Sequence, residues 1–379
     1  MSSLGLRTGS LLVFATATLL SGCGIVPGQR MITPATIQET GGDFSTEASQ
    51  QQTIPITDIN LALLHKMNAE QTSATLPQST LALFGKPPMY RVGPGDVLQI
   101  VVWDHPELAA ALGQPTTSTR AADAIPGFLV DEHGDVQFPY AGTLHVAGKD
   151  SATIQKELYN RLSKVYQKPE VTVRVASFRN AQIYLDGELR TPGAQSLNDI
   201  PMSLTMAVNQ AGGFTATADR SRVELIRNGV IYNLNLGDLI KRGYNPSQIY
   251  LQAGDLVRVA AREDSGVYVM GEVTKPATVL PMRNGSLTLS QAISDSGSFD
   301  QNTAATRQLF VIRDSTSATP QIYHLDATSP VSMVLANQFE LQPKDIVYVG
   351  QGGLVRFNRV LNLLLPAINA AVTGVVLTK

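Results

Sequence analysis

The sequence has a single cysteine, Cys23, and is poor in charge. One cysteine in 379 residues excludes an intramolecular disulfide. Charged residues make up 16% of the chain, and the formal net charge is −2. This balance gives no case for a polyanion-binding surface over the whole chain, so no nucleic-acid partner is expected. With 43% hydrophobic residues, the composition is typical of a secreted globular protein, and the length allows two to four domains.

Histidine and glycine occur without the spacing of a metal or phosphate site. The five histidines belong to no HExxH motif and to no Cys/His pair at metal-ligand spacing. No Lys-Ser/Thr pair follows Gly212-Gly213, as it would in a phosphate-binding loop. We therefore expect no metal and no cofactor.

Patterns for catalysis are also scarce. No GxSxG motif is present. The richest cluster is Asp104-His105-Pro106-Glu107, in which two carboxylates flank an imidazole. An acid/base pair must converge across a cleft, whereas neighbours that follow a strand splay apart. A paired-carboxylate glycosidase stays open, because its carboxylates can come from distant strands. The prediction is nevertheless a protein that is not an enzyme.

The N-terminus has the marks of a secretory signal peptide. Arg7 precedes an apolar run over residues 11–20, which is too short to span a membrane. The sequence Leu20-Ser21-Gly22-Cys23 then resembles the bacterial lipoprotein box. That resemblance implies a signal peptide over residues 1–22 and a lipid on Cys23. Gly24, where an inner-membrane retention signal has Asp, implies the outer membrane. The alternative is a plain secretory signal with an incidental cysteine.

An N-terminal arm and a first module follow. Residues 23–89 are rich in Thr, Gln, Ser, Pro and Gly and indicate an extended arm, with one helix predicted over residues 56–66. Residues 90–178 predict a compact α+β module. Its expected elements are a strand over 97–103 after the turn Gly93-Pro94-Gly95-Asp96, a hairpin around residues 133–135, a helix from residue 151 with Ile154, Leu158, Leu162 and Val165 on one side, and a strand over 171–175.

The next two segments repeat each other and predict tandem domains over residues 179–262 and 263–350. Residues 187–193, 204–214 and 251–259 of the first repeat match residues 271–277, 289–299 and 341–349 of the second. Each repeat is expected to contain a strand, a Gly/Pro turn, a short helix that ends at glycine, and two or three further strands. Gly212 and Gly213 either approach a ligand closely or form a helix C-cap, and the cap is the favoured interpretation.

The C-terminal segment, residues 351–379, is predominantly apolar. At 100° per residue, its polar side chains fall within one arc of about 100°. A helix over residues 354–379 would be about 39 Å long and could cross a hydrocarbon core of about 30 Å. A core helix and a membrane span are equally compatible with this pattern. The arc contains Asn358, Arg359, Asn362, Asn369 and Thr373.

Three blocks of the first module resemble the polysaccharide export domain of outer-membrane polysaccharide exporters, the capsule translocon family of Gram-negative bacteria. The two repeats resemble the soluble-ligand-binding β-grasp domains of that family, and residues 356–366 resemble its C-terminal membrane helix. The motif positions in this sequence are Arg91, Gly93, Gly95, Asp96, Trp103, Asp104, His105, Pro106, Glu107, Phe138, Pro139, Tyr140 and Gly142.

The resemblance implies an α+β protein with an export domain, tandem β-grasp-like domains and a C-terminal transmembrane amphipathic helix that forms an oligomeric α-barrel. It implies a lipid-anchored ring of eight subunits, mostly in the periplasm. Such a ring exports capsular or extracellular polysaccharide without covalent change and contacts an inner-membrane co-polymerase of the tyrosine-kinase type. A lone tail helix would expose its amide stripe to lipid, so it makes physical sense as one member of a ring. Asn358, Asn362, Asn369 and Thr373 are the expected pore lining.

A second hypothesis belongs to a different class. In it, the protein is a periplasmic glycan-binding or sensing lipoprotein without a pore, and the tail is only a docking helix.

Overall fold

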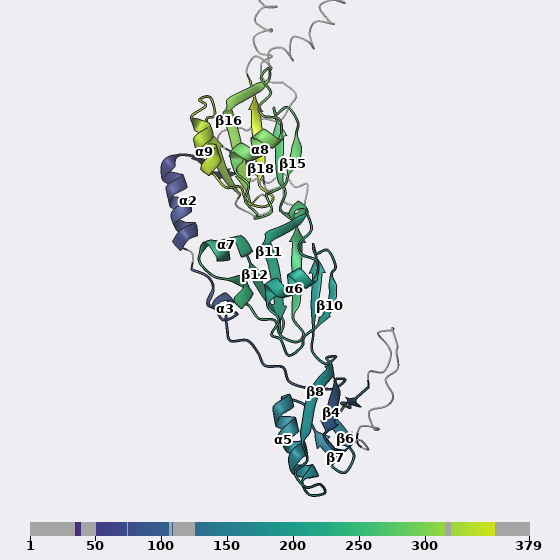
Figure 1. The fold of residues 1–379 in the computed structure, drawn as a ribbon. Helices are drawn as coiled ribbons and strands as arrows, with labels where there is room; N and C mark the ends of the chain where they lie inside the picture. The colour runs from purple at the N-terminus through teal and green to yellow at the C-terminus, as the bar shows by residue number, and fades with distance from the viewer. Residues whose placement is uncertain are drawn as a thin grey trace, which may run out of the picture. The chain divides into compact units, whose positions relative to one another are not determined.

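The structure is a computed structural model that describes residues 35–38, 51–73, 75–105, 108, 126–314 and 320–352 (Figure 1). These residues divide between two compact units. One unit contains Thr75–Asp264 with Met282–Gly285, and the other contains the arm up to residue 74 and the rest of the second repeat. Cys23, Pro106, Glu107 and the tail residues 353–379 lie outside the described residues. Within the described ranges, no helix has the length and apolarity needed to span a membrane.

The first module packs a helix against a small antiparallel sheet. Strand β4 (Val97–Val102) lies between β5 (Phe128–Leu129) and β8 (Val171–Ser177). In β8 the alternation of valines buries Val171 and Val173 against the core, as the sequence predicts. Helix α5 (Ser151–Leu162) buries Ile154, Leu158 and Leu162 in the same core. Val165, expected on that face, lies beyond the end of the helix and is exposed.

The hairpin of the first module differs from the expected one. A turn does form over residues 131–135, where the Asp131 side chain accepts hydrogen bonds from the backbone of His133 and Asp135. However, β5 pairs with β4, and β6 (Asp135–Phe138) pairs with β7 (Gly142–His145). The turn between β6 and β7 is possible because Tyr140 and Gly142 both adopt positive φ, a conformation that the sequence pattern did not reveal.

The two repeats have the same sheet topology. The first contains β9 (Gln182–Gly187), β10 (Gly193–Ser196), β11 (Ala218–Arg227), β12 (Val230–Leu234) and β13 (Leu256–Ala261), in the order β10-β9-β13-β11-β12. The second contains β14 (Val267–Gly271), β15 (Ala277–Val279), β16 (Ala304–Arg313), β17 (Gln321–Leu325) and β18 (Ile346–Gln351), in the matching order β15-β14-β18-β16-β17. Each repeat therefore forms its own domain with its own apolar core.

The remaining elements of the repeats are short helices. In the first repeat they are α6 (Leu204–Gln210), α7 (Leu236–Lys241), η3 (Pro246–Gln248) and η4 (Arg262–Ser265), and in the second they are α8 (Leu289–Asp295) and α9 (Ser332–Gln338). The C-cap interpretation of Gly212 and Gly213 is confirmed. Their N–H groups donate to the carbonyls of Asn209 and Val208, which is the hydrogen-bond pattern of a Schellman motif.

Both repeats need glycine at the end of their first strand. Gly187 and Gly271 have φ of 82° and 92° and lie beside a parallel neighbouring strand. A Cβ at either position would be 2.1 Å from the carbonyl oxygen of Val259 or Val349. The Gly-Glu pair that marks each repeat in the sequence therefore reflects close backbone contact rather than a ligand site.

Each repeat also buries an ion pair at equivalent places. Arg227 pairs with Asp255, and Arg313 pairs with Asp345, with nitrogen–oxygen distances of 2.6 and 2.8 Å. The Arg313 guanidinium lies 5.3 Å from the centroids of the Tyr323 ring and the Phe339 ring. Since both charges are partnered and hydrogen-bonded, their burial is tolerated, and loss of one partner would leave an uncompensated charge.

The arm is not a simple extended segment with a helix over residues 56–66. Strands β1 (Ala35–Gln38) and β2 (Gln51–Ile54) pair with each other, and β3 (Ile56–Asp58) joins the edge of the second repeat beside β17. Helix α2 (Leu61–Ser73) begins only after Asn60, whose side chain accepts a hydrogen bond from the Leu63 N–H. Pairing with β17 overrides the helical spacing of Ile56. A short helix, α3 (Gln78–Leu81), follows.

Candidate functional site

The motif of the first module is organised around a buried carboxylate. Asp96 is fully buried and accepts hydrogen bonds from the Tyr90 hydroxyl at 2.7 Å and from the Gly93 N–H at 3.0 Å. It also accepts from the N–H groups of Arg179 and Asn180 at 2.8 and 2.9 Å. Four donors around one carboxylate satisfy its buried charge. Asp96 therefore joins the start of β4 to the end of β8 and has a structural role.

The surroundings of Asp96 also fix the protonation of Tyr90. Burial raises the pKa of the Tyr90 phenol, and the hydrogen bond to Asp96 and its negative charge raise it further. Tyr90 therefore stays protonated and remains a donor. Gly93 lies close to Asn180, because a Cβ at residue 93 would be 2.1 Å from the side-chain amide nitrogen of Asn180 and would displace that side chain. Arg91 donates a hydrogen bond to the Gly148 carbonyl at 2.7 Å and closes this part of the module.

Trp103 differs from these residues because it lies on the surface. Its side chain is 59% exposed, whereas aromatic side chains of this size are usually largely buried. The indole Nε1 donates a hydrogen bond to Thr172 Oγ1 at 3.2 Å, and the Trp103 backbone N–H donates to the Glu170 carbonyl at 2.8 Å. Two contacts to the segment at the start of β8 thus hold a large aromatic ring in a fixed, accessible position.

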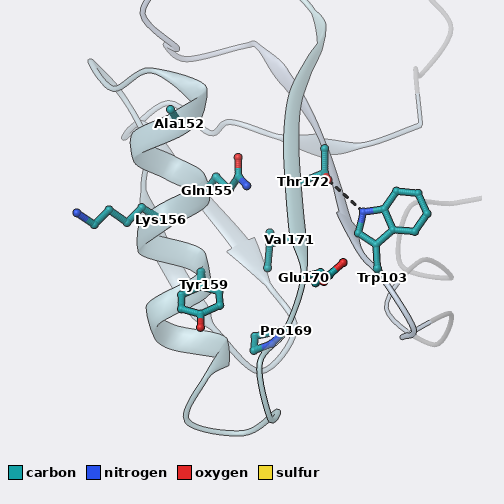
Figure 2. Close-up of a pocket in the computed structure, with 9 residues that line it drawn as sticks. All are labelled: Trp103, Ala152, Gln155, Lys156, Tyr159, Pro169, Glu170, Val171 and Thr172. Atoms are coloured by element: carbon teal, nitrogen blue, oxygen red, sulfur yellow. Dashed lines mark hydrogen bonds between the residues drawn. The ribbon is translucent and has the colours of Figure 1, made fainter.

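An open hollow of about 630 Å³ lies at this place (Figure 2). One wall is the exposed face of α5, and another is the segment that leads into β8, with Trp103 beyond that strand (Figure 2). Tyr159 on α5 is 42% exposed and gives the hollow a second aromatic ring. The lining residues are Trp103, Ala152, Gln155, Lys156, Tyr159, Pro169, Glu170, Val171 and Thr172.

The rest of the motif gathers around a tyrosine that the sequence analysis missed. Tyr166 lies between α5 and β8, and its ring centroid is 4.2 Å from that of His105 and 5.6 Å from that of Tyr140. Asp104 is exposed and adopts φ of 62°, so the chain turns sharply between Trp103 and His105. The imidazole therefore belongs to an aromatic cluster with motif residues from the β6–β7 turn.

Arg161 and Tyr159, both on α5, also escaped the sequence analysis. Arg161 on α5 donates hydrogen bonds to the carbonyls of Ala141 and Thr143 and so holds the β6–β7 turn that contains Tyr140. Phe138 is buried against Phe128, with ring centroids 4.9 Å apart, while the neighbouring Pro139 is half-buried. The only sequence signal for Arg161 and Tyr159 was their place on the polar side of a predicted amphipathic helix, which does not distinguish them from solvated residues.

The hollow contains several groups that can bind a ligand noncovalently. It offers two aromatic faces, the ammonium of Lys156, the carboxylate of Glu170, the amide of Gln155 and a hydroxyl. Among the described residues, no group of three or more His, Cys, Asp or Glu side chains is placed to hold a metal ion. Such a surface suits a ligand with both apolar ring faces and many hydroxyl groups.

Comparison with known proteins now gives the family. Residues 85–176 match the family described as polysaccharide biosynthesis/export protein, and residues 181–259 and 265–349 match the SLBB domain. The export match covers 92 residues and the two SLBB matches cover 164, and a polysaccharide export relative described below is 42% identical over 95% of this chain. The chain belongs to the polysaccharide biosynthesis/export protein family. The resemblance of the first module and of the two repeats is thereby confirmed, and the hollow beside Trp103 and the buried Asp96 both lie within the matched export region.

Three relatives of this polysaccharide export protein are informative. The EPS I polysaccharide export outer membrane protein EpsA of Ralstonia nicotianae is 42% identical over 369 residues, which cover 95% of each chain. The capsule polysaccharide export protein BexD of Haemophilus influenzae is 25% identical and covers 94% of each chain. The capsule polysaccharide export outer membrane protein CtrA of Neisseria meningitidis is 26% identical over 74% of this chain and 77% of its own.

Proposed function

We propose that this protein is an outer-membrane lipoprotein that forms a multimeric channel for export of a capsular or extracellular polysaccharide. Membership of the export family and the names of EpsA, BexD and CtrA support the substrate and the membrane. The observation that carries the proposal is the hollow beside Trp103, where a fixed aromatic ring is exposed within the export region.

The hollow fits a sugar polymer in transit. A pyranose ring has apolar C–H faces that pack on aromatic rings and a rim of hydroxyls that hydrogen-bond to amide, carboxylate and ammonium groups. Because the hollow is open and its side chains are exposed, each sugar would be held weakly. A conduit needs binding of this kind, since the substrate must both enter and leave. The polymer passes without covalent change.

The membrane part of the proposal concerns residues outside the described ranges. Lipid on Cys23 anchors the arm, and residues 354–379 form one helix of a ring of eight, with Asn358, Asn362, Asn369 and Thr373 toward the lumen. The compact unit that contains β3 of the arm also contains β18, from which the tail continues. In the proposal, the lipid anchor and the membrane helix both extend from this one unit, so both can insert into the same membrane. The partner at the periplasmic end is a tyrosine-kinase type co-polymerase of the inner membrane.

Surface labelling tests the channel. A cysteine placed at Thr378 is expected to react with a membrane-impermeant maleimide on intact cells, because the tail would end outside. A cysteine at Ser163, which is exposed in the export module, should react only after the outer membrane is permeabilised. Absence of labelling at residue 378 in assembled, expressed protein would rule out the channel and favour the glycan-sensing alternative.

Substitution of Trp103 tests the contact with polymer. Trp103→Ala removes the exposed ring and is expected to lower surface polysaccharide at least several-fold with normal amounts of folded protein. Trp103→Phe should retain part of the export, because it keeps an aromatic face and loses the hydrogen bond to Thr172. Val165→Ala is the control, since Val165 is 55% exposed in the same module and does not line the hollow. Unchanged polysaccharide in Trp103→Ala would contradict the proposed contact.

A further inference from the structure

The first repeat contains a second hollow, of about 700 Å³. Its walls come from α6, from the segment that leads into β11, from α7 and from the loop that leads into η3. Its volume lies within the range of about 300–1,000 Å³ that is common for small-molecule sites. The lining residues are Thr205, Phe214, Arg220, Leu236, Gly237, Ile240, Gly243, Tyr244, Asn245, Pro246, Ser247 and Asn284.

The charge at this hollow is an arginine without an anionic partner. The Arg220 guanidinium carbon lies 5.1 Å from the centroid of the Phe214 ring, and the Arg220 backbone N–H donates to the Arg283 carbonyl. Within the part of the chain that the structure describes, no ion pair involves Arg220. The acidic side chains nearby have other partners, since Asp238 pairs with Arg242 at 2.8 Å and Asp219 accepts hydrogen bonds from Ser221. The Arg220 guanidinium, which lies over the Phe214 ring, is therefore available to bind an anionic group.

Aromatic and hydroxyl groups complete the hollow. The Tyr244 ring is held by Phe84, with centroids 5.4 Å apart, and is partly exposed. The Thr205 hydroxyl donates to the Ser247 hydroxyl at 2.9 Å. Asn284 adds an amide to the lining. The site thus combines flat apolar faces, hydroxyls and a guanidinium, which is the set of groups that a charged sugar requires.

We propose that this hollow binds a saccharide unit that carries a carboxylate, with Arg220 as the carboxylate contact and Phe214 and Tyr244 against the sugar ring. A planar guanidinium matches a carboxylate with two parallel hydrogen bonds, whereas a neutral hexose offers it only hydroxyls. The inference rests on the proposed export function and narrows its substrate class to an acidic polysaccharide. The bound unit belongs to the passing polymer or is a free acidic sugar, and both have the same recognition chemistry.

Binding of D-glucuronate and of D-glucose to the full chain in detergent tests the proposal, by saturation-transfer difference NMR and calorimetry. Glucuronate is expected to bind at least tenfold more tightly than glucose, and Arg220→Gln is expected to remove that difference. Arg258→Gln is the matched control, because Arg258 is an exposed arginine of the same repeat that pairs with Asp186 and does not line the hollow. A glucuronate tetrasaccharide that binds more tightly than the monosaccharide would identify the polymer as the source, and equal affinity would identify the free sugar.

Equal affinity for the two monosaccharides, or an Arg220→Gln variant with unchanged selectivity, would overturn the proposal. The proposal would also be overturned if no sugar bound and Ile240→Asp changed the size of the oligomer. The hollow would then be a contact between copies of the chain. These outcomes are separate from failure of the channel, which is measured by labelling at residue 378. A labelled tail with no glucuronate preference would leave the export function in place and remove only the acidic site.

Discussion

At the scale of single residues, one turn recurs in all three modules. Asp96, Asp255 and Asp345 are each buried and each accept a hydrogen bond from the backbone N–H three residues earlier. The residue before each aspartate has a positive φ, of 91°, 84° and 68°. It is glycine in the first two modules and Lys344 in the third. The turn therefore keeps its shape where the favoured residue is absent, at a cost in backbone strain.

This strain predicts the effect of a substitution at Lys344. Lys344→Gly is expected to raise the free energy of unfolding of the second repeat by about 1 kcal/mol, because glycine adopts positive φ without the Cβ penalty. The reciprocal change, Gly254→Lys in the first repeat, is expected to lower stability by about 1–2 kcal/mol. Space is not the obstacle at Gly254, since a Cβ there would meet no atom within 4 Å. Urea denaturation of the two variants beside the parent protein measures both shifts.

The sequence reveals such residues only in part. The Gly-Asp pairs at 95–96 and 254–255 can be recognised as turns from the sequence alone. The partners of the aspartates were not visible, because Arg227 and Arg313 lie 28 and 32 residues away from Asp255 and Asp345 and resemble ordinary strand residues in the pattern. The sequence also did not show that the Trp103 side chain is exposed. A tryptophan after an apolar strand is compatible with the core as well as with the surface, and only the hydrogen bond to Thr172 settles its position.

At the scale of elements, α5 shows how a cap links the helix to pH. Asp150 is its N-cap and accepts a hydrogen bond from the Thr153 backbone N–H at 2.7 Å. Hydrogen bonds from the side chain and backbone of Thr153 hold the pKa of the Asp150 carboxyl below its usual range. The charged form thus stabilises the folded module. Its contribution is present above the unfolded pKa of about 4 and is lost as the pH falls through the lower folded pKa.

An Asp150→Asn variant isolates this contribution. Asparagine caps a helix about as well as aspartate but does not titrate. The thermal midpoint of the parent protein is therefore expected to fall more steeply than that of Asp150→Asn as the pH is lowered below about 4. Melting curves of both proteins between pH 2.5 and 7 measure the difference. Parallel pH profiles would show that the Asp150 cap does not couple the module to pH.

Elements with a strong local pattern were predictable and edge pairings were not. The helix that begins at residue 151 and the strand over residues 171–175 follow from apolar spacing and capping residues alone, although the observed strand extends to Ser177. The pairing of β6 with β7 depends on positive φ at Tyr140, and the end of α5 before Val165 depends on packing. The likeness of the repeats was visible in the sequence, and their shared strand order explains it, because each matching segment occupies the same place in its sheet.

At the scale of the whole molecule, the arm from β3 to α2 is part of the second repeat. Strand β3 extends the sheet beside β17, and His324 fixes it there. The two nitrogens of the His324 ring lie 2.6 Å from Asp58 Oδ1 and 2.8 Å from the Arg307 carbonyl oxygen. Ile59 and Leu64 are buried in the core of the repeat. No sequence pattern predicted this, because a three-residue strand has too little period to be recognised and its partner is distant in the chain.

Truncation of Ile59 measures what the arm contributes. Ile59→Ala is expected to lower the free energy of unfolding of the second repeat by about 2–4 kcal/mol, since it removes buried methylene and methyl groups from a packed core. Leu61→Ala is the control, because Leu61 is 56% exposed on α2 and should change stability by less than about 0.5 kcal/mol. Equal denaturation curves for the two variants would mean that the arm only lies against the repeat without stabilising it.

The pairing of β3 with β17 also sets an order of folding. The residues that pair, Asp58 and His324, are 266 positions apart, so the strand that is synthesised first must wait for an edge that is synthesised much later. Closing so long a loop is entropically costly in an unfolded chain and costs less once the intervening domains have folded. The arm is therefore expected to dock last. Until it does, the edge of β17 stays open to strands of other molecules, so this protein is most exposed to misassembly late in its folding.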